Sequence, residues 1–475
     1  MQGSPDPSIQ MGAPFQDGMI LQRDMKVPVW GWSAPGDTIT VEFAGQKVTA
    51  KAGEDGKWML MLEPLKASAE PTEMVVSSSI SSLASHISNI LVGEVWFCSG
   101  QSNMAWKMGD LGKHYDKEIK EADYPRLRLF NVPKDMFATT PQSRVEGAWH
   151  ICTPETVKSF SAVAFFFGSK LHDKLQMPIG LVESSRGGSA IAGWISEPVL
   201  RHGFPEFTAH LDTYRGITEK TGGVFDHRRK SKLHGITQTA PSVLYNARVH
   251  PFVPYAIRGV IWYQGETDVG IPERYRQLFP ALIRQWRKSW GQGDFPFYYV
   301  QIAPCGYEGQ SVSAAYLREA QMMTMSEPYT GMAVAMDVGH PKNLHPFEKK
   351  PLGERLALWA LAKDYGHKDL VYSGPLYKTF TVEGGRIRLH FDHVGGGLAS
   401  RDGEPLCHFA VAGEDKHFVP ATAVIDGDTI LVSSPEIAGP VAARFAFGSA
   451  DIPNLMNREG LPASSFRTDD DPVPE

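Results

Sequence analysis

Four polar, glycine-rich segments of the sequence each follow directly after a short apolar run. The apolar runs span 90–97, 179–182, 260–263 and 332–336, and the polar segments that follow them are 99–103, 183–188, 264–266 and 337–345. If the runs are parallel strands, their carboxyl ends lie on one edge of a sheet, where ligands bind in a crevice. We therefore expect the four segments to meet in space.

The residue types in these segments suit ester hydrolysis, which needs an activated hydroxyl, a base and donors for the tetrahedral oxyanion. Ser102 follows Gly100 in a predicted strand-to-helix turn that would expose its hydroxyl. His345 is a base of suitable pKa. The main-chain N–H groups of Ser102 and Gly188, with the side-chain amide of Gln264, are the predicted oxyanion donors.

Other polar residues of the same segments have weaker signals. Glu266 could act as an acid, but a carboxylate that holds its own loop through hydrogen bonds is the favoured interpretation. Arg186 is a candidate for contact with a substrate and fits a solvated position equally well. Gln101 and Asn103, on either side of Ser102, are further candidates for substrate contacts.

The periodicity of the chain predicts three domains. Residues 1–89 contain period-two alternation, for example over 38–43, and frequent turns, which indicate a β-sandwich. Residues 90–368 alternate apolar runs with helical stripes at 160–175, 275–286, 314–325 and 352–365. This alternation indicates an α/β fold with a parallel sheet and helices on both faces. Residues 369–475 return to a β-pattern, with a hairpin expected at Asp426 and Gly427.

Composition excludes several classes of protein. The net charge of −6 argues against a nucleic-acid partner, and no apolar run is long enough to predict a membrane span. The four cysteines show no paired spacing, so we expect no zinc site and mostly free, buried thiols. Residues 1–8 lack the pattern of a signal peptide. The basic run 228–230 is interpreted as a solvated surface without a function.

Several blocks of the sequence together carry a family resemblance. Residues 93–104, GEVWFCSGQSNM, resemble the first block of the sialate O-acetylesterase family, a branch of the SGNH hydrolases. Segments 19–23, 241–246, 259–266, 317–321, 345–346 and 460–467 are similar to further blocks, in the same order. The resemblance implies an SGNH-hydrolase-like, flavodoxin-like core and a serine esterase that deacetylates sugars such as 9-O-acetylated sialic acid or acetylated xylan. It also implies no metal, no organic cofactor, and a periplasmic or secreted location.

The sequence departs from the SGNH pattern at the catalytic acid. Many of these enzymes have an Asp three residues before the His, where this chain has Lys342, followed by Asn343. Either a dyad operates, with a main-chain carbonyl or Asn343 orienting His345, or an acid comes from elsewhere. Asp337 is the preferred outside candidate. A dyad is physically acceptable because loss of the acid does not abolish catalysis, and it is the favoured hypothesis because Asp337 lies eight residues before His345 and would have to reach back along the loop.

Two alternative functions stay open at this point. One is a carbohydrate-binding protein whose hydrolase core is inactive, which the missing Asp would favour and the four complete segments argue against. The other is a short-chain lipase or thioesterase. That function would need an apolar tunnel for the acyl chain, whereas the predicted loops are polar and glycine-rich.

Overall fold

A computed structural model describes residues 9–80, 84–133, 136–221, 224–226, 236–307 and 311–473. Two compact units make up the chain: residues up to Ile261 with Ala281–Phe295, and Trp262–Pro280 with the residues from Pro296 onward. The N-terminal segment 1–8 and the basic run 228–230 lie outside the described residues. The three domain boundaries expected from the sequence stay a prediction.

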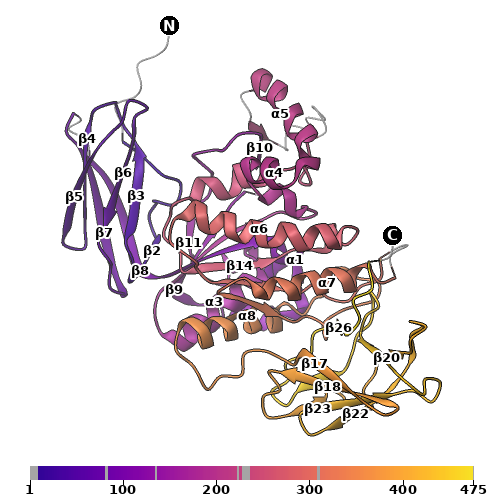
Figure 1. The fold of residues 1–475 in the computed structure, drawn as a ribbon. Helices are drawn as coiled ribbons and strands as arrows, with labels where there is room; N and C mark the ends of the chain where they lie inside the picture. Colours follow the sequence, from indigo (N-terminus) through magenta and orange to yellow (C-terminus); the bar gives the residue numbers. More distant parts are fainter. Residues whose placement is uncertain are drawn as a thin grey trace. The chain divides into compact units, whose positions relative to one another are not determined.

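The first unit begins with antiparallel β-structure, drawn in indigo in Figure 1. Strand β3 (Val27–Trp32) lies between β1 (Gln10–Met11) and β6 (Lys57–Leu62), and β4 (Thr38–Phe43) pairs with β5 (Gln46–Lys51) and β7 (Ser68–Ser78). The predicted alternation in β4 is confirmed, because Ile39, Val41 and Phe43 are buried while the intervening residues are more exposed. Alternation of this kind buries one face of the strand in a core.

The long strand β8 (Ala84–Gly100) links this β-structure to the α/β part of the first unit. Its early residues pair antiparallel with β7, and it also pairs in parallel with β2 (Ile20–Gln22) and β12 (Ile179–Ser185). Strand β9 (Tyr124–Asn131) pairs in parallel with β12, and β11 (Trp149–Cys152) pairs antiparallel with β9. The large sheet is therefore mixed: β8, β12 and β9 are parallel, as the sequence predicted, whereas β7 pairs antiparallel with β8 and β11 pairs antiparallel with β9.

Helices of the first unit surround this sheet. Helix α3 (Ala162–Leu175) packs on β9 and β12, as its apolar stripe predicts, and its N-cap Ser161 accepts a hydrogen bond from the Ala164 N–H. The remaining elements are α1 (Ser102–Ala105), α2 (Asp116–Lys120), β10 (Met136–Ala138), α4 (Glu197–Gly203), α5 (Thr208–Thr221) and β13 (Val224–Asp226). Strand β14 (Gly259–Tyr263) and helix α6 (Pro272–Trp290) each contribute residues to both units.

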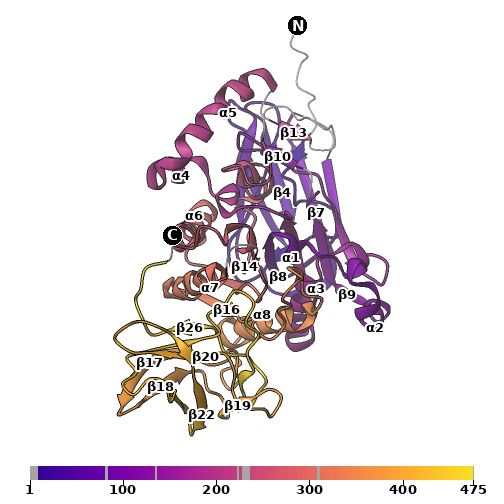
Figure 2. The ribbon, with the colours of Figure 1, turned by 90° about the vertical axis from the view of Figure 1, so that its right-hand side faces the viewer.

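The second unit contains a parallel pair of strands and three β-sheets that lie near the C-terminus. Strands β15 (Phe297–Val300) and β16 (Thr330–Ala333) are parallel and pack on α8 (Lys349–Asp364), while α7 (Ser313–Met323) connects them. The C-terminal strands gather together in Figure 2. The first sheet has the strand order β17 (Leu376–Glu383), β18 (Arg386–Asp392), β23 (Thr429–Ser433), β22 (Thr422–Asp426). The second pairs β19 (Leu398–Ser400) with β25 (Leu455–Asn457). The third has the order β21 (Val419–Pro420), β20 (Phe409–Ala412), β24 (Ala442–Phe445), β26 (Phe466–Arg467).

Local predictions of the second unit are also confirmed. Asp426 pairs with Thr429 at the end of a tight hairpin between β22 and β23. Arg318, in α7, is fully buried and donates hydrogen bonds to the Ser465 hydroxyl and to main-chain oxygens of residues 446, 448 and 449. This anchor gives a structural reason for the similarity of segments 317–321 and 460–467.

The four cysteines are free, and three of them are buried.

Glu94 in β8 is a fully buried carboxylate that holds three segments of the first unit. Its oxygens accept hydrogen bonds from Gln22 (3.0 Å) and Arg23 next to β2, and from Arg258 (2.7 Å), which precedes β14. Gln22 also accepts a hydrogen bond from the Val95 N–H at 2.8 Å. Two guanidinium groups therefore compensate one buried negative charge, an arrangement in which removal of the charge is costly.

We predict that Glu94→Gln destabilises the protein strongly. Loss of the carboxylate charge leaves Arg23 and Arg258 without their shared partner, which costs about 3–5 kcal/mol for a buried pair. Urea denaturation followed by circular dichroism would show the midpoint falling. Glu63→Gln is the matched control: Glu63 pairs with Lys26 at 3.4 Å on the surface, and such pairs contribute about 0–1 kcal/mol. Equal midpoints for the two variants would contradict this account of Glu94.

Candidate active site

Ser102 lies in the first unit, at a sharp turn between a strand and a helix. Strand β8 is buried from Ile90 to its end at Gly100, whose φ of 141° is a conformation that favours glycine. Gln101 caps helix α1, and Ser102 is its first residue. Ser102 is half-buried, whereas its neighbours Gln101 and Asn103 are each only 1% exposed. The predicted strand-to-helix turn is present, and Ser102 is more accessible than either of its neighbours.

The loop after β12 lies against this turn. The Arg186 N–H donates to the Gly100 carbonyl at 2.9 Å, and a Cβ added to Gly187 would lie 3.5 Å from the Cβ of Ser102. Gly188 is exposed and has a φ of 66°, a left-handed conformation that suits glycine. The structure thus brings Ser102 and the 186–188 loop together. A main-chain N–H can approach a ligand closely where the residue has no side chain.

The other predicted residues of the first unit are partly used by the fold. The Arg186 guanidinium lies over the Phe137 ring, 5.4 Å from its centroid, which holds part of this side chain against the protein. Burial of Gln101 and Asn103 favours a structural role for both over contact with a sugar. Ser99 supports the same turn, since its hydroxyl donates to the Ser184 carbonyl at 2.6 Å.

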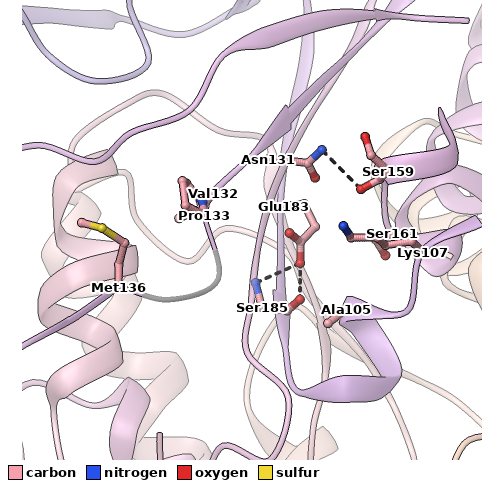
Figure 3. Close-up of a pocket in the computed structure, with 10 residues that line it drawn as sticks. All are labelled: Ala105, Lys107, Asn131, Val132, Pro133, Met136, Ser159, Ser161, Glu183 and Ser185. Carbon is pink, nitrogen blue, oxygen red and sulfur yellow. Dashed lines mark hydrogen bonds between the residues drawn. The ribbon is translucent and has the colours of Figure 1, made fainter. Parts of the chain in front are cut away.

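A cavity of about 370 Å³ opens beside the Ser102 turn, entirely within the first unit. It begins at Ala105, the last residue of α1, and reaches Ser185 at the end of β12 (Figure 3). Its polar lining consists of Lys107, Asn131, Ser159, Ser161, Glu183 and Ser185. A pocket of this size with a few polar groups is suited to a small organic ligand.

Gln264 and Gly265 occupy the end of β14 in the second unit. Gln264 is fully buried, and its side-chain amide donates to the Asp268 carboxylate. Its carbonyl accepts hydrogen bonds from the Tyr275 hydroxyl and the Gln321 amide, both at 3.1 Å. A Cβ on Gly265 would lie 2.8 Å from Ile302 and Leu317 side-chain atoms, so only glycine fits. The position of the predicted oxyanion donor is therefore fixed by its neighbours.

Glu266 is buried in the second unit near a lysine that sequence analysis did not identify. Lys349, at the start of α8, is fully buried, and its ammonium lies 5.6 Å from the centroid of the Tyr263 ring. Burial lowers the pKa of Lys349 to about 7, against the opposing effect of the Glu266 and Glu348 carboxylates. The negative charge of Glu266 therefore stabilises a buried cation, which favours the structural interpretation of Glu266.

His345 precedes this lysine by four residues and is half-buried. Burial lowers the pKa of its imidazole, and the positive charge of Lys349 lowers it further. The His345 main-chain N–H donates to the Asn343 side-chain oxygen at 3.0 Å. Asn343 thus holds the main chain of His345, which gives it a local role in the loop other than the predicted contact with the imidazole.

Asp337, the other candidate for orienting His345, is engaged by an arginine. Its two carboxylate oxygens accept hydrogen bonds from Arg355 in α8, at 2.7 and 2.6 Å. Arg355 also donates to the Val334 carbonyl at 2.8 Å. Among the described residues, these contacts leave the Asp337 carboxylate paired with Arg355, and they do not bring it to His345.

The sequence did contain a signal for Lys349. Lys349, Leu352 and Leu356 are spaced by three and four residues, which places them on one face of a helix, and all three are fully buried. A lysine on the apolar face of a predicted helix, four residues after a candidate base, is therefore recognisable. Arg355 carried no such signal, since its partner Asp337 lies in another element.

Two further searches concern metals and membranes. Within the described ranges, no three His, Cys, Asp or Glu side chains are grouped so that they could hold a metal ion. No helix in the part of the chain that the structure describes is long and apolar enough to cross a membrane.

Comparisons with known proteins identify the family. A family model described as "Carbohydrate esterase, sialic acid-specific acetylesterase" matches residues 231–361. Sialate O-acetylesterase of Homo sapiens is 31% identical over 408 residues, 76% of this chain and 72% of the relative. The Mus musculus enzyme is 31% identical over 423 residues, 79% and 77% respectively. The crystal structure of a carbohydrate acetylesterase from Xanthomonas citri is 36% identical, with a TM-score of 0.86 over 98% of this chain and 100% of that chain. The predicted resemblance is confirmed: the chain belongs to the sialate O-acetylesterase family, and it is an ester hydrolase.

Proposed function

We propose that this protein removes O-acetyl groups from carbohydrates through an acyl-enzyme, with Ser102 as nucleophile and His345 as base. The observation that carries the proposal is the half-buried Ser102 at a glycine-dependent turn, beside the 186–188 loop. The names of the relatives, sialate O-acetylesterase and carbohydrate acetylesterase, support acetylated sugars as substrates. O-acetylated sialic acids and acetylated plant polysaccharide fragments are the two substrate groups we expect.

The proposed reaction has two steps. In the first, His345 takes the proton from the Ser102 hydroxyl while its oxygen bonds the acetyl carbon; the bond from that carbon to the sugar oxygen then breaks, and the sugar oxygen receives the proton. In the second, His345 activates a water that releases acetate and regenerates Ser102. N–H groups of Ser102 and Gly188, with the Gln264 amide, would stabilise the oxyanion. The mechanism requires the hydroxyl and imidazole to approach within about 2.6–3.2 Å.

We also infer the SGNH-hydrolase arrangement for the α/β part. The parallel pairs of β12 with β8 and β9, and of β15 with β16, support it. In this arrangement the polar segments that follow β8, β12, β14 and β16 lie at the carboxyl ends of strands, where substrate would bind.

A Ser–His dyad is the form of the catalytic group that the contacts of the second unit favour. The Asp337 carboxylate is paired with Arg355, and Asn343 bonds the main chain of His345. In a dyad, the base benefits from an environment that keeps it neutral before the reaction. Burial and the Lys349 charge both lower the pKa of His345 and so supply this condition.

We predict that Ser102→Ala lowers kcat for acetyl esters by a factor on the order of 10⁴–10⁶, because the covalent step is lost. Turnover of p-nitrophenyl acetate and p-nitrophenyl octanoate would measure it and would also test the lipase alternative. Ser99→Ala is the comparison from the same turn; it removes one buried hydrogen bond but not the nucleophile, so it should lower kcat far less than Ser102→Ala does. A Ser102→Ala enzyme with wild-type rates would refute the proposed mechanism.

Asp337→Asn distinguishes the dyad from a triad. We expect it to lower kcat less than about tenfold, whereas loss of an orienting acid costs on the order of 10⁴-fold. Arg355→Gln is the matched variant, since it breaks the same ion pair from the other side. Similar kinetic constants for the two variants would indicate that the Asp337–Arg355 ion pair has a structural role only. A large loss of kcat confined to Asp337→Asn would establish Asp337 as the acid.

Lys349→Met should raise the pKa of the His345 imidazole, because it removes a positive charge that disfavours the imidazolium. The acidic limb of the kcat/KM profile should move to higher pH, since the neutral imidazole is the active form. Burial is the larger cause and persists, so the pKa should stay below its ordinary value of 6.5. NMR titration of the histidine ring carbons measures this pKa directly, and the signal that is missing in His345→Gln identifies His345. Lys342→Met, an exposed change three residues before His345, is the control; an unchanged His345 pKa in Lys349→Met would contradict the account.

A further inference from the structure

The cavity of the first unit lies next to the turn that carries Ser102. Ala105 is one helical turn from Ser102 in α1, and Ser185 immediately precedes Arg186, whose N–H bonds the Ser102 turn. Its volume of about 370 Å³ is at the lower end of the range for small-molecule sites, about 300–1,000 Å³. The cavity therefore has room for a sugar ring beside the nucleophile.

The lining of the cavity has one apolar and one polar side. Val132, Pro133 and Met136 form the apolar side, whereas Lys107 and Glu183 are on the polar side (Figure 3). A sugar ring has the same division, with C–H groups on its faces and hydroxyl groups around its edge. An acyl chain would leave the polar side without hydrogen bonds, which is costly.

Glu183 supplies the most specific feature of the cavity. Its side chain is 92% buried, and one carboxylate oxygen accepts hydrogen bonds from the Ser185 N–H, at 3.0 Å, and hydroxyl. The other oxygen is turned away from Ser185 (Figure 3), and in the described part of the chain no hydrogen-bond partner meets it. Because Glu183 lines the cavity, this oxygen can accept a hydrogen bond from a hydroxyl group of a ligand.

The charges of the cavity favour an uncharged ligand. Lys107 lines the same cavity and has no ion pair within the described residues. Burial raises the pKa of Glu183, while Ser185, Arg248 and Lys107 lower it. A ligand carboxylate could pair with Lys107 but would be brought close to Glu183, whereas hydroxyl groups can bond to both residues.

We propose that this cavity binds the sugar residue that carries the scissile acetyl group, as an uncharged ring whose hydroxyl groups donate to Glu183 and accept from Lys107. The proposal rests on the proposed function, because it assigns the leaving group of that reaction. It makes Glu183 and Lys107 residues that determine specificity for the sugar.

The test is the ratio of kcat/KM for an acetylated xylo-oligosaccharide to kcat/KM for p-nitrophenyl acetate, which has no sugar. In Glu183→Gln this ratio should fall at least about tenfold, the scale for loss of a hydrogen bond to a charged group. Lys107→Met should also lower it. The exposed residues Glu121 and Lys113 provide the controls Glu121→Gln and Lys113→Met, in which the ratio should match wild type.

An unchanged ratio in Glu183→Gln would overturn the proposal. The proposal would also be overturned if Lys107→Met lowered kcat/KM for 9-O-acetylated sialic acid, relative to p-nitrophenyl acetate, but left the ratio for the xylo-oligosaccharide unchanged. The cavity would then bind an anion. Calorimetric binding of the xylo-oligosaccharide to Ser102→Ala, with and without Lys107→Met, needs no catalysis and no Glu183 variant. If the double variant binds the xylo-oligosaccharide more weakly than Ser102→Ala does, the result supports the cavity as the sugar site, whether or not Ser102 is the nucleophile. Equal binding by the two proteins contradicts the cavity as the sugar site.

Discussion

The compensation of one buried charge, that of Glu94, is the constraint on which the first unit depends. The carboxylate is fully buried within β8, and it is bound by Gln22 and Arg23 at the end of β2 and by Arg258 before β14. These contacts fix the part of β8 that leads to Ser102 relative to the start of β14, the strand that leads to Gln264. Because the carboxylate tolerates burial only with its partners, the register of these segments is closely specified.

A second buried ion, Arg248, joins the walls of the cavity. Its guanidinium donates to the carbonyls of Val132, at 3.3 Å, of Pro133, and of Ser185, at 3.0 Å. The Ser184 hydroxyl donates in return to the Arg248 carbonyl at 2.9 Å. Three main-chain oxygens from two loops therefore share one cation. The loops that follow β9 and β12 are set by the same side chain, so the shape of the cavity is tied to the fold.

The positions of β8, β12 and β14 and of the Ser102 turn could be predicted from the sequence, because apolar runs and a glycine turn are local signals. The block of residues 93–104 similarly identified the family. Three features could not be predicted, since each depends on contacts between distant elements. The antiparallel pairing of β7 with β8 makes the sheet mixed, Arg355 occupies the carboxylate of Asp337, and Ser185 turns Glu183 so that one oxygen faces the cavity. A polar residue after a strand indicates a site, but its partner decides its role.

The pairing of charges in the second unit explains how a base could work without an acid. Asp337 is neutralised by Arg355, and Glu266 is the nearby counter-charge of the buried Lys349. What acts on His345 is then burial and a positive charge, both of which favour the neutral imidazole. A conventional acid stabilises the imidazolium that forms during the reaction, whereas this environment increases the fraction of base that is ready to accept a proton. In the proposed mechanism the imidazolium is then less stable, so transition-state stabilisation would come mainly from the proposed oxyanion donors, of which Gln264 is held in place by its neighbours.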